Sequence, residues 1–467
     1  MSDRLSALDA SFLYLEDRTT PMHVGGIAVF TRSCSGLDYD QVLKLVERRL
    51  PLVPRYRQKV RGIPGGLARP VWVDDPDFDL TYHVRRSALP KPGNDAQLHE
   101  LAGRLMSREL DRSRPLWELY LVEGLSHDRV AVITKTHQAM VDGNGALDIG
   151  QVILDTAREA GADEDEDLWV PRREPSLAQL ALEAAAETVR RPGEIVENAR
   201  AAAFDVTATA GKVARAAGGV ASAVRTAAVP SPGGPLNAPT SAHRRFAVAR
   251  ATLEQLRQVR RAHGATVNDV VLSVVAGALR NWLLSRGEVV RSSTTLRAMV
   301  PLSVREDAMQ PARSRDGQVS SYLVDLPVGE ANPVVRLHQI GHAMRAHRES
   351  GQSVAADALL RLSGFAPPTL HALGARAANA FSSRLFNVLV TNVPGPQVPL
   401  YAAGAKMAEM FPVVPLARNQ SLSIGVTSYD GGVCFGLNAD RDAMSDVDVL
   451  AAMIEESVEE MIGTVHV

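Results

Sequence analysis

The stretch that decides the fold is residues 130–143, which read VAVITKTHQAMVDG. Its first half is rich in β-branched residues and predicts a strand. Beyond the glycine, small and apolar residues recur with the spacing of one helix face: Ala146, Ile149, Gly150 and Ile153. A strand is therefore expected to lead into a helix, with His137, Gln138 and an Asp-Gly pair between them. Because α/β proteins place groups that point into a cleft at such turns, we take this turn as the candidate active site.

Length and composition are ordinary for a soluble globular protein. At 467 residues the chain exceeds one compact core, so two or three domains are expected. The formal net charge of -2 gives no electrostatic reason to bind nucleic acid. The first thirty residues lack a secretory pattern, and no apolar run reaches the roughly 18 residues of a spanning helix. Cys34 and Cys434 are too few for a disulfide framework, and we expect a cytoplasmic protein.

The first domain is expected at residues 1–165, where predicted strands alternate with helices. Residues 23–31 predict one strand. Residues 114–122 predict a second, mostly buried strand, which is expected to pair with the strand that begins at Val130.

A change of composition follows this domain. An acidic run at 163–167 gives way to alanine-rich sequence and then to proline and glycine at 230–235. Alanine favours helix but buries little apolar surface, so these helices would be weakly held. We interpret residues 166–243 as a crossover linker between two domains.

The second domain is expected at residues 244–467. Thr252 and Gln255 fit a helix capping box, and Gly264 follows the end of that helix. Further strands are predicted at 295–302, 319–326, 385–391, 421–427 and 433–438. Ser445 is the predicted cap of a closing helix. Two mixed α/β domains with a cleft between them fit this order of elements.

Several motifs together resemble one known family. Residues 137–143 look like an HHxxxDG signature, residues 115–117 read PLW, Asn268 and Asp269 form an ND pair, and residues 392–396 read NVPGP. Further similar segments lie at 8–12, 236–237, 243–246 and 300–305. In this combination and order the chain resembles the bacterial wax ester synthase/diacylglycerol acyltransferase family of the CoA-dependent acyltransferase superfamily. The resemblance covers essentially the whole chain outside the linker.

The resemblance implies both a fold and a reaction. The fold would be two chloramphenicol acetyltransferase-like mixed α/β domains with a channel at their interface. The reaction would move a long-chain acyl group from acyl-CoA, as co-substrate, to a lipid alcohol, either diacylglycerol or a fatty alcohol. No metal or prosthetic group is expected, because the thioester is already activated. Peripheral contact with a membrane or lipid droplet is expected, and the apolar segment 359–370 is the best candidate for a lipid-facing surface.

The chain departs from the family at the residue that matters most for this chemistry. The resemblance implies that the second histidine of the signature removes the acceptor's proton, but here Gln138 stands at that position. An amide can orient a hydroxyl by hydrogen bonding but cannot accept its proton near neutral pH.

Three readings of this departure remain open. His137 acts as the base; Gln138 only orients the hydroxyl and the enzyme is slow; or the chain is a catalytically impaired paralogue that binds lipid or acyl-CoA. Strand alternation argues mildly against the first, because neighbouring residues face opposite sides. A further alternative is an acyltransferase whose acceptor is a polyketide or glycolipid alcohol.

Structural roles are expected around the turn. The resemblance implies that Asp142 pairs with an arginine, either Arg297 or Arg305, while Gly143 permits the tight backbone turn.

Other candidate residues come from the remaining motifs. Asn268 and Asp269 fall in the first turn of a predicted helix, where an acidic side chain interacts favourably with free amides. Four residues are candidates for substrate binding: Trp117, Asn392, Ser320 and Ser321. The indole could line an acyl tunnel or pack in the core, the asparagine could shape the cleft mouth, and the serines could donate to the oxyanion.

Overall fold

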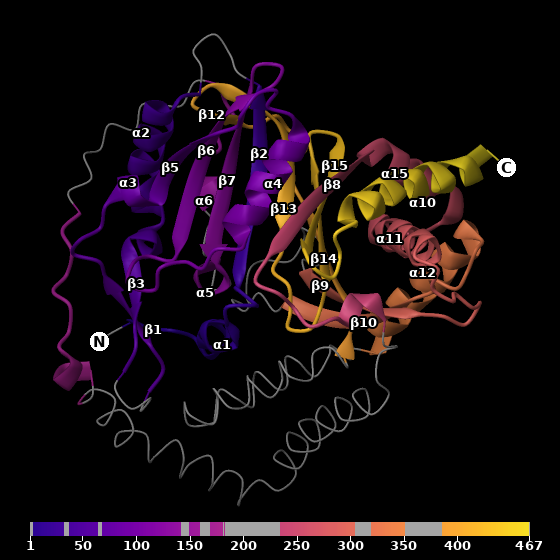
Figure 1. The fold of residues 1–467 in the computed structure, drawn as a ribbon, viewed down its shortest axis with the longest axis horizontal. Coiled ribbons are helices and arrows are strands. Elements are labelled where there is room, and N and C mark those ends of the chain that lie inside the picture. The colour runs from indigo at the N-terminus through magenta and orange to yellow at the C-terminus, as the bar shows by residue number, and fades with distance from the viewer. Residues whose placement is uncertain are drawn as a thin grey trace, which may run out of the picture.

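Two six-stranded sheets with helices packed on them form the body of the protein (Figure 1). The structure is a computed structural model, and it describes residues 3–31, 37–63, 68–141, 149–158, 169–180, 182, 234–303, 319–350 and 385–466. A separate three-stranded sheet, in the order β1-β4-β3, lies beside the first six-stranded sheet and comprises β1 (Asp3–Arg4), β3 (Gln58–Arg61) and β4 (Val71–Asp74). The expected α/β fold with two domains is confirmed.

The first sheet has the strand order β12-β13-β2-β7-β6-β5. Its strands from the first half of the chain are β2 (His23–Thr31), β5 (Val84–Ala88), β6 (Trp117–Leu125) and β7 (Arg129–His137). The predicted strands at 23–31 and 130–136 are confirmed. Strand β7 lies between β2 and β6 and is antiparallel to both, so the candidate turn begins at the end of an interior strand.

Helices cover both faces of the first sheet. They are α1 (Ala7–Leu15), α2 (Tyr39–Arg49), α3 (Leu80–His83), α4 (Asp95–Met106), α5 (Gln138–Val141) and α6 (Ile149–Val152). Helix α4 buries Leu98, Leu101 and Leu105, which recur on one helix face, and it packs between this sheet and the second domain. The helix expected after β7 is realised as the short helices α5 and α6; residues 142–148 between them lie outside the described residues.

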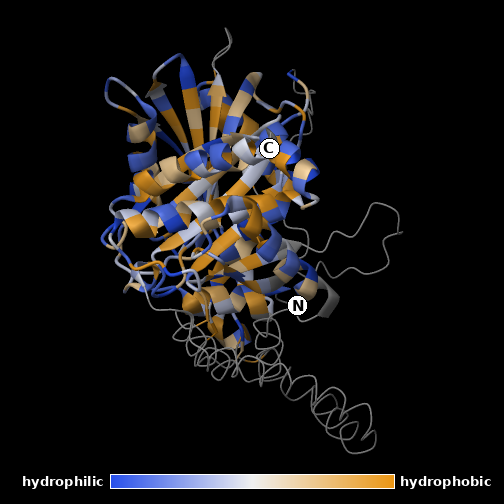
Figure 2. Ribbon diagram, turned by 90° about the vertical axis from the view of Figure 1, so that its right-hand side faces the viewer, coloured by the Kyte–Doolittle hydropathy of each residue, from blue (hydrophilic) through white to orange (hydrophobic). Residues whose placement is uncertain are grey.

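The second sheet has the order β10-β9-β11-β14-β15-β8. Its strands are β8 (Arg244–Thr252), β9 (Leu296–Ser303), β10 (Val319–Leu326), β11 (Val388–Pro394), β14 (Leu422–Tyr429) and β15 (Gly432–Asp440). Helices α10 (Leu253–His263), α11 (Val267–Ser285), α12 (Pro333–Ser350) and α15 (Val447–Gly463) lie on its outer side, away from the first sheet (Figure 1). On the side of the molecule that faces the viewer in Figure 2, the helices carry both hydrophilic and hydrophobic residues.

Most of the predicted boundaries in the second domain agree with the structure. The capping box of Thr252 and Gln255 is present, and Gly264 ends helix α10 with a positive φ of 64°. The predicted cap of the last helix is wrong, because Asp446 rather than Ser445 precedes α15. Helix α11 is long and apolar enough to span a membrane by composition, but it is largely buried in the second core.

One segment of the second half of the chain crosses into the first sheet. Strands β12 (Tyr401–Ala402) and β13 (Ala405–Val413) extend that sheet, with β13 antiparallel to β2. The expectation that residues 244–467 form one separate domain is wrong for this segment. The sequence does not reveal this crossing, because a strand that pairs with another domain has the same alternating pattern as a strand that pairs within its own.

Two glycines explain how β13 can cross over the second sheet. Gly425 of β14 and Gly436 of β15 stand opposite each other in the ladder. A Cβ at 436 would lie 2.0 Å from the Pro412 carbonyl oxygen, and a Cβ at 425 would lie 2.9 Å from the Pro412 ring. The missing side chains therefore leave the space that the crossing strand occupies.

This close approach predicts the effect of adding one methyl group. We expect Gly436→Ala to lower the free energy of unfolding by about 1–3 kcal/mol, because the new Cβ meets backbone that cannot rotate away. Gly463→Ala is the matched control, since a Cβ there meets nothing within 4 Å. Urea unfolding of both variants measures the difference, and equal stability would contradict the tight crossing.

Candidate active site

The candidate turn is held at its backbone from two sides. His137 is the last residue of β7, and Gln138 is the first residue of α5. The His137 N–H donates to the Leu116 carbonyl at 2.9 Å, and the Gln138 N–H donates to the Met22 carbonyl at 2.9 Å. The PLW segment and the start of β2 therefore fix the backbone from which both side chains project.

The imidazole of His137 is buried and directed at protein groups. Its exposed fraction is 1%, and Nδ1 accepts a hydrogen bond from the Ala139 N–H at 3.0 Å. Because Nδ1 accepts, the proton of the neutral ring is on Nε2, which lies 3.5 Å from a carboxylate oxygen of Glu16. This arrangement argues against His137 as the general base, because the lone pair that would take a proton is already used by the backbone.

Glu16 is a site residue that the sequence analysis missed. It caps the C-terminus of α1, and its carboxylate is nearly buried. Arg112 Nη2 donates to Oε2 at 2.6 Å, the Met22 N–H reaches Oε1 at 3.3 Å, and His23 Nε2 lies 3.4 Å from Oε1. His23 is paired with His137 across the β2–β7 ladder, and the two rings meet edge to face.

The protonation states of this cluster follow from burial and pairing. Burial raises the pKa of the Glu16 carboxyl, but contacts with His137, His23 and Arg112 outweigh it and hold the pKa below its usual range. Burial lowers the pKa of His23 to about 4, despite the neighbouring carboxylate. At neutral pH the cluster therefore holds a charged Glu16, a neutral His23 and the cationic Arg112.

Gln138 differs from its neighbour in exposure. Its side chain is partly exposed, whereas that of His137 is buried. The two adjacent residues differ in burial at the point where strand β7 ends and helix α5 begins. Of this pair, Gln138 is the residue that is not buried.

A second buried charge lies on the same strand. Lys135 is fully buried, donates to the Arg108 carbonyl at 2.5 Å and lies 3.5 Å from Glu118. Glu118 also pairs with Arg85 at 3.1 Å and accepts from the Tyr120 hydroxyl at 2.8 Å. Burial lowers the pKa of Lys135 to about 8. These contacts explain how the charge is tolerated inside the first domain.

A small, mostly apolar cavity lies beside strands β2 and β7. The residues that line it come from these strands, from the segment beginning at α6 and from β13: Gly26, Ala28, Phe30, Val132, Thr134, Gly150, Ile153, Leu154 and Met410. Small side chains at Gly26 and Ala28 leave this space next to the interior strands that lead to the turn.

The PLW tryptophan is a core residue, which agrees with one of its two expected roles. Trp117 is fully buried, its indole N–H donates to the Tyr56 carbonyl at 2.8 Å, and its ring stacks on His83 at 4.6 Å. Its indole packs in the core, and lining of an acyl tunnel stays a prediction.

The ND and NVP motifs meet in the second domain. Asn392 Nδ2 donates to Asn268 Oδ1 at 3.3 Å. Asp269 is buried and completes a capping box with Thr266, which confirms its expected place in the first turn of a helix. These contacts show structural links for the two asparagines and leave substrate binding by Asn392 a prediction.

The remaining predicted residues are only partly described. Arg297 pairs with Asp325 at 2.8 Å. Its expected partner Asp142, the adjacent Gly143 and the alternative Arg305 lie outside the described residues. Ser320 and Ser321 lie on edge strand β10, with their backbones paired to Leu302 and Pro301; their side chains lie outside the described part of the chain. Their proposed contact with the oxyanion stays a prediction.

Comparison with known proteins gives consistent matches over the whole chain. The sequence model of the wax ester synthase/diacylglycerol acyltransferase catalytic domain matches residues 5–271, and that of the corresponding C-terminal domain matches residues 317–462. The probable diacylglycerol O-acyltransferase tgs3 of Mycobacterium tuberculosis is 51% identical over 261 residues, which cover 56% of this chain and 96% of the relative. The probable diacylglycerol O-acyltransferase tgs1 of the same species is 34% identical over 99% of this chain and 96% of its own length.

Solved structures agree with these sequence matches. A wax ester synthase/diacylglycerol acyltransferase from Marinobacter aquaeolei VT8 has a TM-score of 0.67 and 28% identity, covering 99% of this chain and all of that one. The starter condensation domain of rhizomide synthetase has a TM-score of 0.57 at 15% identity, covering 100% of this chain and 95% of that one. The second likeness shows a shared fold.

The buried neutral His23 predicts a pH dependence of stability. Its pKa of about 4 lies below the ordinary 6.5, so the unfolded chain binds the extra proton first as the pH falls. This contribution is fully present above pH 6.5 and is lost between pH 6.5 and 4, with a slope of at most about 1.4 kcal/mol per pH unit. We expect His23→Gln to flatten the dependence in urea unfolding measured across this window.

His99 supplies a matched control for this experiment. Burial also lowers its pKa to about 4, but it lies on α4, away from the turn. His99→Gln should flatten the pH dependence by a similar amount while leaving acyl transfer close to that of the unaltered protein. An unchanged slope in His23→Gln would contradict the buried neutral state.

Proposed function

Because this chain belongs to the wax ester synthase/diacylglycerol acyltransferase family, we propose that it transfers a long-chain acyl group from acyl-CoA to a lipid alcohol. Diacylglycerol, which would give triacylglycerol, is the first candidate acceptor, because the named relatives are probable diacylglycerol O-acyltransferases. A fatty alcohol, which would give a wax ester, is the second, because the name of the matched family includes that activity. The match across both domains is the observation that carries this proposal.

The reaction needs no group beyond the two substrates. The acceptor hydroxyl oxygen forms a bond to the thioester carbonyl carbon, the carbon–sulfur bond breaks, and the hydroxyl proton ends on the sulfur of CoA. The protein has to position both substrates, favour removal of the proton and stabilise the oxyanion. The thioester is already activated, so we propose that no metal or prosthetic group takes part.

Gln138 is the residue we assign to the acceptor hydroxyl. It occupies the position where the family signature has its second histidine, and its side chain is the more exposed of the pair. Its carboxamide orients the hydroxyl toward the thioester but does not take the proton. His137 and Glu16 act as positioning residues, because their contacts fix the turn from which Gln138 projects. Turnover is therefore slow compared with an enzyme that carries a histidine base.

The proposed products, triacylglycerol or a wax ester, are lipids. Since either ester would be insoluble in water, we propose peripheral contact of a cytoplasmic protein with a membrane or lipid droplet. The lipid-facing candidate 359–370 lies outside the described residues.

The second candidate function is binding without turnover. It is favoured by the same residue, because Gln138 removes the base that the family signature supplies and His137 is committed to backbone and carboxylate contacts. Such a paralogue would hold acyl-CoA or a lipid alcohol but would not join them.

A single substitution tests the catalytic proposal. The purified protein is assayed with labelled palmitoyl-CoA and dioleoylglycerol, or with hexadecanol. We expect slow ester formation, and we expect Gln138→His to raise kcat by about a hundredfold to ten-thousandfold, because general base catalysis is restored. Gln138→Leu, which can neither orient nor deprotonate, is expected to fall to the background rate.

The same assay separates the alternatives. Binding of palmitoyl-CoA without ester formation, in both the unaltered protein and Gln138→His, would support the binding paralogue and overturn the catalytic proposal. If acceptor competition shows activity only with a polyketide or glycolipid alcohol, the proposed acyl transfer stands and the proposed acceptor is wrong.

A further inference from the structure

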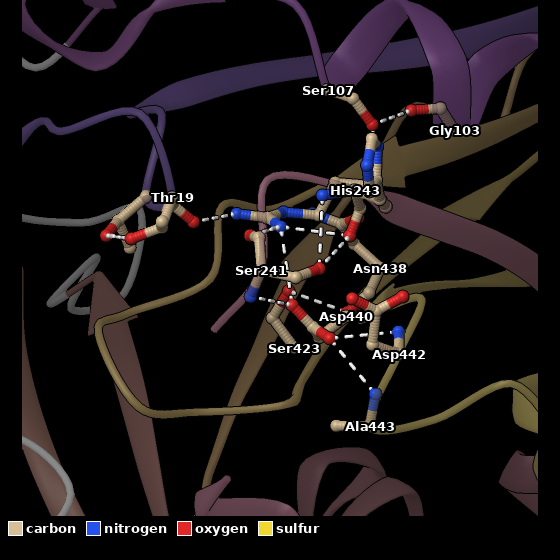
Figure 3. A network of polar contacts seen from close by, with 12 residues as sticks. Thr19, Gly103, Ser107, Ser241, His243, Ser423, Asn438, Asp440, Asp442 and Ala443 are labelled. Atoms are coloured by element: carbon tan, nitrogen blue, oxygen red, sulfur yellow. Dashed lines mark hydrogen bonds and ion pairs between the residues drawn. The ribbon is translucent and has the colours of Figure 1, made fainter. Parts of the chain in front are cut away.

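Arg244 connects the second domain to the loop that carries part of the candidate site. Figure 3 shows the surrounding polar network, with Thr19 on one side and Ser241 and Asp440 on the other. It is the first residue of β8, and its side chain is only 2% exposed. Its Nη2 donates to the Thr19 carbonyl of the first domain at 2.5 Å. Its Nη1 donates to the carbonyls of Ser241 at 2.8 Å and His243 at 3.1 Å. One guanidinium group thus joins segments that are 225 residues apart in the chain.

Asp440 holds this cation from the second domain. Its carboxylate is buried and lies 3.7 Å from Arg244 Nη1. The same carboxylate accepts from the backbone N–H groups of Ser241 at 2.5 Å, Asp442 at 3.0 Å and Ala443 at 3.1 Å. Because a buried ion pair is tolerated only when its other hydrogen-bonding capacity is satisfied, this set of bonds leaves Arg244 little freedom.

The backbone of Arg244 is fixed against the first domain as well. Its N–H donates to Ser107 Oγ at 2.8 Å, and this hydroxyl donates to the Gly103 carbonyl at 2.7 Å (Figure 3). A Cβ at 103 would lie 2.8 Å from the Arg244 carbonyl oxygen. Helix α4 and strand β8 therefore approach so closely that the base of the Arg244 side chain has a set distance to the first domain.

Thr19 belongs to a small, internally bonded turn. Asp17 Oδ1 accepts from the Thr19 N–H at 2.8 Å, from the Thr19 hydroxyl at 2.7 Å and from the Thr20 hydroxyl at 2.8 Å. Glu16 directly precedes this turn and closes the loop by accepting the Met22 N–H. A group that fixes the Thr19 carbonyl therefore also fixes Glu16, and with it the position of its carboxylate beside the two histidines.

We propose that Arg244 is a positioning residue for acyl transfer, acting through the Thr19 carbonyl on Glu16 and so on the turn that carries Gln138. The proposal rests on the function proposed above and extends it, because it makes the site depend on a residue of the second domain. Without the guanidinium, Glu16 can move away from His137 and the turn loses a support.

A double-mutant cycle tests this pathway. Arg244→Met is expected to lower kcat by about tenfold to a hundredfold, because misplacement of a positioning group by about 1 Å has effects of this size, and to change KM for acyl-CoA less than twofold. The double variant with Glu16→Gln should be no slower than Glu16→Gln alone, because the two residues act in one chain of contacts. If the double variant shows the full combined loss in kcat of the two single variants, the proposal is overturned.

Arg245 is the matched control, and lysine is the second variant at 244. Arg245 is the next residue, but its side chain is 45% exposed and pairs with the exposed Asp448. Arg245→Met should therefore keep kcat. Arg244→Lys retains the charge and replaces Arg244→Met in the double-mutant cycle if that variant does not fold. We expect Arg244→Lys to lower kcat in part, because a single amine cannot make all the hydrogen bonds of the guanidinium group.

Hydrogen exchange gives a readout that does not need turnover. Peptides covering residues 16–23 should exchange faster in the Arg244 variants than in Arg245→Met, while those from the core of α11 remain unchanged. Unchanged exchange at 16–23 would overturn the proposal even if catalysis is lost. The unaltered protein could also form no ester while the Arg244 variants still exchange faster at residues 16–23. That result would support the role of Arg244 in holding this segment and would overturn only the proposed function.

Discussion

A buried carboxylate between two histidines is the interaction on which the candidate site depends. Removing a charged Glu16 from water is unfavourable unless its oxygens are bonded, and here Arg112, the Met22 N–H and the histidines surround it. This requirement fixes three separate segments at once: the end of α1, the start of β2 and the end of β7. These segments determine the position of the turn that carries Gln138.

The same cluster holds the first histidine of the signature in place. His137 uses Nδ1 to accept from a backbone amide and directs Nε2 at Glu16, so both ring nitrogens face protein groups. The neighbouring position is the more exposed one, and it carries an amide.

The two halves of the molecule are joined by more than contact between surfaces. Strand β13 leaves the second half of the chain to pair with β2, and it crosses β14 and β15 at facing glycines. Arg244 then reaches back to the loop between α1 and β2. Strand β2 carries His23 at its start, so the element that receives the crossing strand also supplies part of the buried cluster.

The sequence by itself determined the α/β class, strand β7, most strands of the second domain, the capping of α10 and the position of the candidate turn. These features follow from local spacing, from β-branched composition and from motifs that are contiguous in the chain. Tertiary structure alone decided that Glu16 faces His137, that Trp117 is core, that β13 belongs to the first sheet and that Arg244 meets Thr19. Each of these features depends on contacts between residues far apart in the chain. The local sequence does not specify which distant group a buried side chain will contact. The physical reason is that periodicity reports which face of an element is buried, whereas the partner on that face is set by how the elements pack.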